Sequence, residues 1–206
     1  MKNEVILIGH YGSDLTHAQS AWTSTSREIT TEKQGRIPQL LEMLASEGHH
    51  TPFEKSSLHF LVTVDQATHI HLLKHRIGVS INGESARYKE LKEDKFYIPD
   101  DWPVELQLML DEYTSIGNAM YHKVLHKLTE THGRKRAKES ARFFKTFSSQ
   151  ITMDVMFNFR SFAHFLKLRY DEHAQKEVRE LAGEMLRLVK ELDGNPFEHT
   201  LKAYGY

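Results

Sequence analysis

The sequence predicts an α+β fold, in which strands and helices are mixed without regular alternation. Three short apolar or alternating segments have the character of strands, and longer segments with helical periodicity separate them. Because these elements do not follow a strict strand–helix–strand order, a doubly wound parallel sheet is not expected. A chain of 206 residues can bury one sizeable core, so we expect a single domain spanning residues 1–206.

The first half of the chain begins with an apolar run at residues 5–8, which suits a first strand. Residues 37–46 are expected to form a helix, because Pro38 lies near its start and Gly48 is placed to end it. In residues 57–64 apolar side chains occupy every second position. That pattern predicts a strand with one strongly apolar face.

A second helix is expected at residues 67–76, and residues 77–103 are expected to be mostly loop because they contain glycines and a Tyr-Ile-Pro-Asp-Asp turn. Pro103 then opens a long helix that Gly133 should break, and a further helix should run to about Phe147. One face of the long helix is apolar at helical spacing. It consists of Leu106, Leu110, Tyr113, Ile116, Met120, Val124 and Leu128.

The remaining elements are a strand at residues 151–157, a helix at residues 160–169 and an amphipathic helix at residues 174–192. Arg169 falls on the apolar face of its helix, where an unpaired guanidinium would be costly. It could form a buried ion pair or reach solvent from the helix end. It could also be held in a dry pocket to meet an anionic ligand. The polar face comprises Arg160, His164 and Lys167, and the apolar face Phe162, Phe165 and Leu166.

Composition excludes several classes of protein. A formal charge of -1 gives no reason to expect nucleic acid as a partner. The absence of cysteine excludes disulfides, thiolate metal sites and a cysteine nucleophile, and fits a reducing compartment. The N-terminus lacks the features of a signal peptide, and no segment is long and apolar enough to span a membrane. We therefore expect a soluble, cytoplasmic protein without membrane partners.

Two polar segments could carry chemistry. Residues 74–76 (Lys-His-Arg), followed by Ser85 and Arg87, offer cations and a hydroxyl suited to phosphate oxygens, although short basic runs are usually solvated. The histidines at 49–50 and at 69 and 71 lack the spacing of known zinc motifs, so no metal site is expected. Ser85 is not flanked by the glycines of a hydrolase nucleophile elbow.

Four segments, taken in order, resemble the flavin-dependent thymidylate synthases (the ThyX family). The family signature is Arg-His-Arg, seven residues and then Ser-x-Arg-Tyr, and residues 74–88 provide a variant of it. Residues 48–54 resemble the upstream Gly-His-x-Thr-Pro-Phe-Glu block. Residues 158–161 and 168–175 resemble the Asn-x-Arg-Ser and Leu-Arg-x-Asp-x-His-Ala-Gln blocks, with Arg142 at the family's spacing ahead of them.

The resemblance implies a mostly antiparallel sheet flanked by helices and a homotetramer whose active sites are shared between subunits. It implies the conversion of dUMP to dTMP by an FAD enzyme, with methylenetetrahydrofolate as one-carbon donor and NADPH as reductant. The absence of cysteine agrees, because classical thymidylate synthases use a cysteine nucleophile.

The resemblance also assigns roles to individual residues. Arg169 would be the catalytic residue, contacting the pyrimidine and favouring its ionised N3. Residues implied in dUMP binding are His71, Lys74, Glu84, Ser85, Ala86, Arg87, Arg142 and Arg169. Residues implied in or near the FAD site are His49, Thr51, Glu54, Lys74, His75, Arg76, Asn158, Arg160, His164 and His173.

The chain departs from the family mainly around the nucleotide. Lys74 replaces an arginine, and residues 77–84 are eight where the family has seven, so this loop is expected to bulge or shift its register. Either Gly83 or Glu84 could stand for the usual glutamate, and His71 for a glutamine. The alternatives are methylation or hydroxymethylation of another pyrimidine nucleotide, and a non-catalytic flavin- or nucleotide-binding protein.

Overall fold

A computed structural model describes residues 1–206. The strands are β1 (Glu4–Tyr11), β2 (Ser57–Asp65), β3 (Val79–Gly83) and β4 (Gln150–Phe157). The α-helices are α1 (Asp14–Trp22), α2 (Thr31–Gly35), α3 (Ile37–Ser46), α4 (Gln66–Leu72), α5 (Val104–Ala141), α6 (Phe159–Arg169), α7 (Lys176–Lys190) and α8 (Glu198–Ala203). Two 3₁₀ turns are η1 (Thr51–Glu54) and η2 (Arg142–Phe144).

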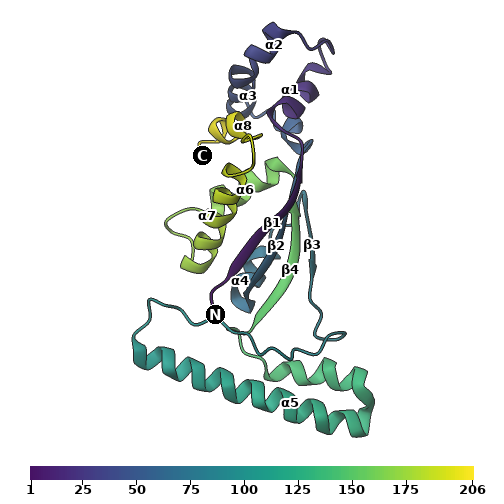
Figure 1. Cartoon of the computed structure of the whole chain (residues 1–206), viewed down its shortest axis with the longest axis vertical. Coiled ribbons are helices and arrows are strands. Elements are labelled where there is room, and N and C mark those ends of the chain that lie inside the picture. Colours follow the sequence, from purple (N-terminus) through teal and green to yellow (C-terminus); the bar gives the residue numbers. More distant parts are fainter. The chain divides into compact units, whose positions relative to one another are not determined.

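The strands form one sheet in the order β1-β2-β4-β3 (Figure 1). This mixture of helices with an antiparallel sheet confirms the predicted α+β class. The chain divides into two compact units. Unit 1 comprises residues 1–4, 62–74 and 82–153, and unit 2 comprises residues 5–61, 75–81 and 154–206. The single-domain organisation stays a prediction.

The core of unit 2 lies under the apolar face of β2. Leu58 and Phe60 are fully buried, as the alternation in the sequence predicted. The Phe60 ring lies 5.8 Å from that of Phe162 on α6, and Phe157 of β4 lies 5.3 Å from Phe165. Helix α6 is therefore held against the sheet by aromatic packing, which fixes the directions of the polar side chains on its other face.

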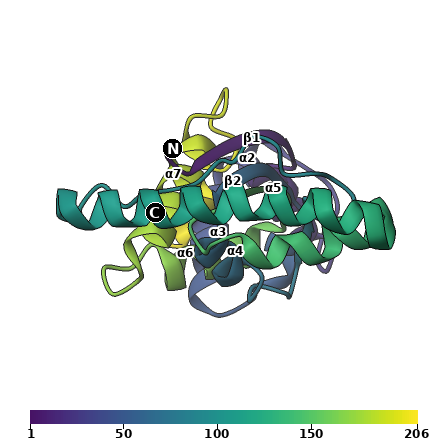
Figure 2. The ribbon, with the colours of Figure 1, turned by 90° about the horizontal axis from the view of Figure 1, so that it is seen from below.

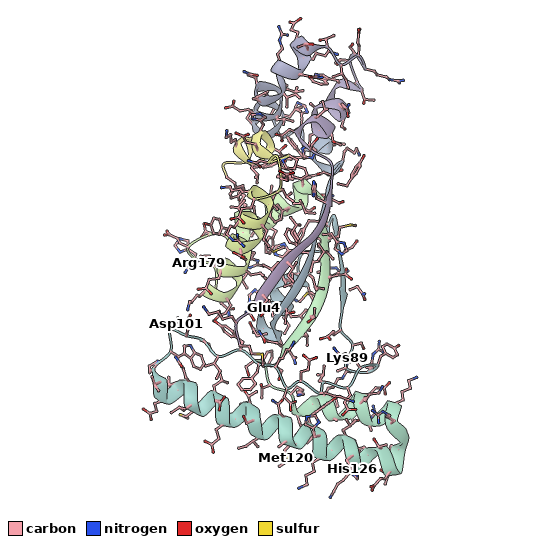
Figure 3. All side chains as sticks on the ribbon, in the orientation of Figure 1. Glu4, Lys89, Asp101, Met120, His126 and Arg179 are labelled. Atoms are coloured by element: carbon pink, nitrogen blue, oxygen red, sulfur yellow. The ribbon has the colours of Figure 1, made fainter.

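In unit 1, helix α5 turns back at Gly133, so that its two segments lie side by side (Figures 1 and 2). The break is confirmed, because Gly133 has a φ of 77°, a left-handed conformation that suits glycine. Four of the seven residues on the apolar face of α5 are exposed and three are partly buried, with Val124 and Leu128 packed against the core residues Tyr121, Leu125, Ala137 and Ala141. Tyr113 and Ile116 are 64% and 53% exposed, and Met120 is also exposed (Figure 3).

The buried face of α5 is set instead by the chain after its end. An added Cβ at Gly117 would lie 2.7 Å from the Phe144 carbonyl oxygen, so this chain approaches the helix closely. The neighbouring buried residues Thr114 and Asn118 bond to Ser148 and Lys145. Polar contacts thus turn one side of α5 inward and leave most of its apolar side outside.

Two predicted helix ends are wrong. Helix α4 ends at Leu72, which is buried, so residues 74–76 lie beyond the helix. There the chain turns, and the Lys74 N–H donates to the carbonyl of His71. The second segment of α5 ends at Ala141 rather than near Phe147. Residues 77–103 are mostly loop, as expected, apart from strand β3, which gains backbone partners on β4 that its own sequence does not reveal.

None of the helices combines the length and the apolar composition that crossing a membrane would require.

Candidate functional site

The segment 48–54 is shaped by the end of helix α3. Gly48 has a φ of 74°, its N–H donates to the Ala45 carbonyl, and the His49 N–H donates to the Leu44 carbonyl at 2.8 Å. These two bonds form a Schellman motif, which favours glycine at the left-handed position. Phe53 is fully buried in the turn that follows. The glycine and the phenylalanine of this block are therefore structural, and they fix where the polar residues between and beside them lie.

The start of helix α6 is joined to the residues that follow the basic run. Asn158 caps the helix by accepting a hydrogen bond from the Ser161 N–H at 2.9 Å. The Asn158 N–H donates to the Gly78 carbonyl, and the Ser161 hydroxyl donates to the Ile77 carbonyl at 2.7 Å. Gly78 has a φ of 65°, and an added Cβ would lie 2.3 Å from the Ser161 hydroxyl oxygen. Only glycine fits this close approach without rearrangement.

Glu54 and Arg160 connect the first of these segments to α6. The Arg160 guanidinium donates to the Glu54 carboxylate at 2.5 Å. Both side chains keep substantial exposure, at 49% and 32%, so a ligand could reach them. Arg160 and His164 share the exposed side of α6, as the helical spacing predicted.

Arg169, the last residue of α6, is partly buried rather than enclosed on the apolar face. Its Nε donates to Nε2 of His75 at 3.0 Å. Because Nε2 accepts this bond, the imidazole is neutral and carries its proton on Nδ1. The His75 ring also lies edge-on to Phe165 at 5.0 Å. The suggested buried ion pair is therefore wrong: the arginine bonds a histidine and keeps part of its surface in solvent.

The residues implied in FAD binding lie in unit 2, apart from Lys74 in unit 1. The contacts above bring together three segments of them, 49–54, 75–76 and 158–164. Arg76, His49, Thr51 and His164 are exposed. His173 is exposed as well, in the turn after α6, and no hydrogen bond joins its side chain to the other segments.

These three segments suit a flavin dinucleotide. Arg76 and Arg160 offer exposed guanidinium groups for phosphate oxygens, and Thr51 offers a hydroxyl. A cavity of about 470 Å³ lies beside them in unit 2. Its walls include His49, Thr51, Pro52 and Trp22, and none of the residues that line it is an acid, lysine or arginine. Such a wall would accept an uncharged aromatic ring.

The residues implied in nucleotide binding lie in unit 1, apart from Arg169. Ser85 begins a turn in which its carbonyl accepts the N–H groups of Tyr88 and Lys89, and its hydroxyl accepts that of Arg87. The Arg87 guanidinium lies over the Tyr88 ring at 5.2 Å and is exposed. Arg142 is also exposed.

The other residues of this set lie apart from the turn. His71 is half-buried on α4 and Lys74 is exposed beyond it, while Ala86 is half-buried between Ser85 and Arg87. No hydrogen bond or ion pair connects Arg142, His71 or Lys74 with the 85–87 turn.

The loop that was expected to bulge runs in regular register. At one end of β3, Gly78 pairs with Asn158; at the other, the Glu84 N–H donates to the Thr152 carbonyl. The two pairs lie six residues apart on β3 and also six residues apart on β4, so neither strand contains an extra residue between them. Of the two expected outcomes, the bulge is therefore wrong, because strand pairing accommodates the eight residues; a register shifted relative to the family stays a prediction. The Glu84 carboxylate accepts the Thr152 N–H at 3.1 Å and pairs with Lys89.

Sequence reasoning missed a polar cluster around a buried lysine in unit 1. The Lys145 side chain is 3% exposed, donates to Asp94 and Asn118, and lies 4.5 Å from the centre of the Tyr121 ring. His122 bonds the other oxygen of Asp94, and the two partners together hold the pKa of that carboxyl below its usual value against the opposing effect of burial. Residues 94, 118 and 145 are far apart in sequence, so no local signal could have grouped them.

Comparisons with known proteins agree with this architecture. A family model described as thymidylate synthase complementing protein matches residues 6–193. The chain is 32% identical to a flavin-dependent thymidylate synthase of Thermosipho melanesiensis, over 95% of this chain and 89% of that protein. It is 33% identical to the corresponding protein of Thermosipho africanus, over 95% and 90%.

Among solved structures, it resembles a UMP/dUMP methylase, PolB, from Streptomyces cacaoi bound with 5-Br dUMP. The TM-score is 0.81 and the identity 25%, covering 98% of this chain and 94% of that one.

Proposed function

Because the chain belongs to the flavin-dependent thymidylate synthase family, we propose that it converts dUMP to dTMP with FAD as cofactor. Methylenetetrahydrofolate would donate the one-carbon unit and NADPH the reducing equivalents. The observation that carries the proposal is the assembly in unit 2 of segments 49–54, 75–76 and 158–164 around exposed arginines. FAD, when bound, would supply the redox chemistry of the methyl transfer, and the chain contains no cysteine thiol that could take part.

The residues of unit 2 would hold the flavin and exclude water from one side of it. Arg76 and Arg160 bind the phosphates, while Asn158 holds the start of α6 and the preceding Gly78 turn in place. Glu54 orients Arg160 through their ion pair. His49, Thr51, His164 and His173 would line the rest of the site.

The nucleotide would be held by Ser85, Ala86 and Arg87, with Arg142 as a second cation for its phosphate. His71, Lys74 and Glu84 belong to the same set. Arg169 would act on the pyrimidine, where a fixed guanidinium favours the anionic form of N3 and so makes C5 more nucleophilic. Within unit 2, its bond to His75 ties this arginine to a residue of the flavin set.

A second pyrimidine nucleotide is a specific alternative. The solved relative from Streptomyces cacaoi is described as acting on UMP as well as dUMP, and it matches nearly the whole of this chain. The departures from the family at His71, Lys74 and residues 77–84 concentrate in the nucleotide set. We therefore propose methyl transfer to a second pyrimidine nucleotide, which differs from dUMP in its sugar or its base, as the alternative reaction.

The assay is an anaerobic incubation of the purified, FAD-loaded protein with methylenetetrahydrofolate, NADPH and one nucleotide at a time: dUMP, UMP or dCMP. Formation of dTMP, measured by chromatography, is expected with dUMP. Turnover of UMP or dCMP alone would replace the leading substrate with the alternative. FAD binding without turnover of any nucleotide would favour a non-catalytic flavoprotein.

Arg169→Ala is the decisive variant, and Lys167→Ala, on the exposed side of the same helix, is its matched control. We expect Arg169→Ala to abolish turnover while its FAD content and melting temperature stay near those of Lys167→Ala. Near-normal activity with unchanged FAD content would contradict the assigned role.

We also propose a homotetramer with shared active sites. The apolar side of α5 supports it, because Tyr113, Ile116 and Met120 are exposed in the isolated chain. Sedimentation velocity should give four times the chain mass, and a monomer would contradict this part of the proposal.

A further inference from the structure

A buried chain of polar side chains crosses unit 2. Asp14 on α1 accepts hydrogen bonds from the Thr200 hydroxyl at 2.6 Å and from the backbone N–H groups of His199 and Thr200 at 2.8 Å. His17 Nδ1 lies 2.8 Å from the same hydroxyl, and His17 Nε2 lies 2.8 Å from the Ser56 hydroxyl. The chain thus joins α8 to α1 and to the residues after η1.

The geometry fixes the direction of each bond. The Thr200 hydroxyl has one hydrogen, which goes to the Asp14 carboxylate, so the oxygen accepts from His17 Nδ1–H. His17 Nε2 is then unprotonated and accepts from the Ser56 hydroxyl. Burial lowers the pKa of His17 to about 4, which keeps this neutral form at physiological pH.

The order serine–histidine–threonine–aspartate is similar to a hydrolase relay, but the burial excludes that role. Ser56 is 5% exposed and His17 is fully buried between Phe53 and Phe159, whose rings lie 5.3 Å and 5.6 Å away. A nucleophile needs access to a substrate. A sealed chain of this kind fixes the segments it connects instead.

The end of α8 reaches the 49–54 segment directly. The Tyr204 hydroxyl lies 3.0 Å from His50 Nδ1, and the two rings stack at 6.0 Å. The Tyr204 ring also meets Phe53 edge-on at 5.0 Å. Burial raises the pKa of Tyr204 to about 12, so the phenol keeps its proton at physiological pH and shares a neutral hydrogen bond with His50.

We propose that α8 positions the flavin-contacting turn 49–54, with Tyr204 and Thr200 as its positioning residues. Tyr204 holds His50 and Phe53, which flank Thr51, and Thr200 locks α8 onto α1. The inference rests on the proposed function, because it assumes that this turn contacts FAD. Both residues lie after residue 193, where the match to the family model ends. Flavin affinity would therefore depend on a part of the chain that this match does not include.

Tyr204→Phe tests the proposal, with Tyr206→Phe as the matched control. Tyr206 is half-buried near the same helix, and its hydroxyl makes no hydrogen bond. FAD is titrated into the flavin-free protein and its dissociation constant is measured from the quenching of flavin fluorescence. We expect Tyr204→Phe to raise the constant about fivefold, the effect of losing one hydrogen bond, and Tyr206→Phe to leave it unchanged. The constant for dUMP, whose binding set lies mainly in unit 1, should not change in either variant.

Thr200→Val and Thr200→Ser provide an independent test with a rescue. Valine removes the hydroxyl that bonds both Asp14 and His17, so FAD should bind more weakly to this variant. Serine keeps the hydroxyl and should therefore keep the affinity of the wild type. If Thr200→Val does not fold, the Tyr204 pair decides.

Equal FAD affinity in wild type, Tyr204→Phe and Tyr206→Phe would overturn the positioning role alone. Failure of the wild-type protein to bind FAD would overturn both this inference and the proposed function.

Discussion

Lowering the pH from 7 to 5 should destabilise the flavin-free protein through His17. An ordinary histidine has a pKa of 6.5, and burial lowers that of His17 to about 4 in the folded state. The unfolded chain therefore takes up a proton below pH 6.5 that the folded protein refuses until about pH 4. Stability is complete above the unfolded value and is lost as the pH falls through this window.

The size of the effect follows from the two pKa values. One pKa unit corresponds to about 1.4 kcal/mol, so the whole window is worth about 3 kcal/mol, of which about 2 kcal/mol is lost by pH 5. That is a large share of the stability of an ordinary domain. The structural cause is the hydrogen-bond chain, in which His17 Nε2 accepts from the Ser56 hydroxyl. A second proton on Nε2 would remove this acceptor and would place a positive charge in the core.

Urea unfolding at pH 7, 6 and 5 measures this loss, with His17→Gln as the test variant. Glutamine does not titrate, so the variant should start less stable but lose about 2 kcal/mol less between pH 7 and 5. His126→Gln is the control, because that histidine is 79% exposed and should leave the pH dependence of the wild type. Equal slopes in wild type and His17→Gln would refute the reasoning.

Three substitutions test other contacts. Gly78→Ala should lower the free energy of unfolding by about 1–3 kcal/mol and weaken FAD binding, because its Cβ would collide with Ser161; unchanged urea midpoints would contradict this. Arg160→Gln should change stability by only about 0.5 kcal/mol, since its ion pair is exposed, yet weaken FAD about tenfold in a fluorescence titration. A loss of stability without a loss of affinity would make Arg160 structural. Lys145→Met should cost about 3 kcal/mol in thermal unfolding because it leaves Asp94 without its buried cation, and a loss below about 1 kcal/mol would contradict this.

The nucleotide and flavin sets show what sequence order could and could not predict. Four motif blocks in the correct order identified the family, and the comparisons confirm it. The motifs did not reveal that segments 49–54, 75–76 and 158–164 are joined through Glu54–Arg160 and the Ile77–Gly78 turn. Those contacts depend on which strand pairs with which, and adjacent residues carry no signal of it.

The sequence by itself determined the elements whose cause is local. Helix α3 has the predicted bounds because Pro38 and Gly48 act on their own backbone, and β2 is buried on alternate residues because a strand has a period of two. Only the tertiary structure decided what distant residues do. Polar contacts with the chain after α5 left part of its apolar side exposed. Pairing with β4 made a strand of the expected loop, and Asp14 bonds Thr200 across 186 residues. Each of these depends on partners that no local pattern specifies, because a hydrogen bond or a packed ring needs both groups in place.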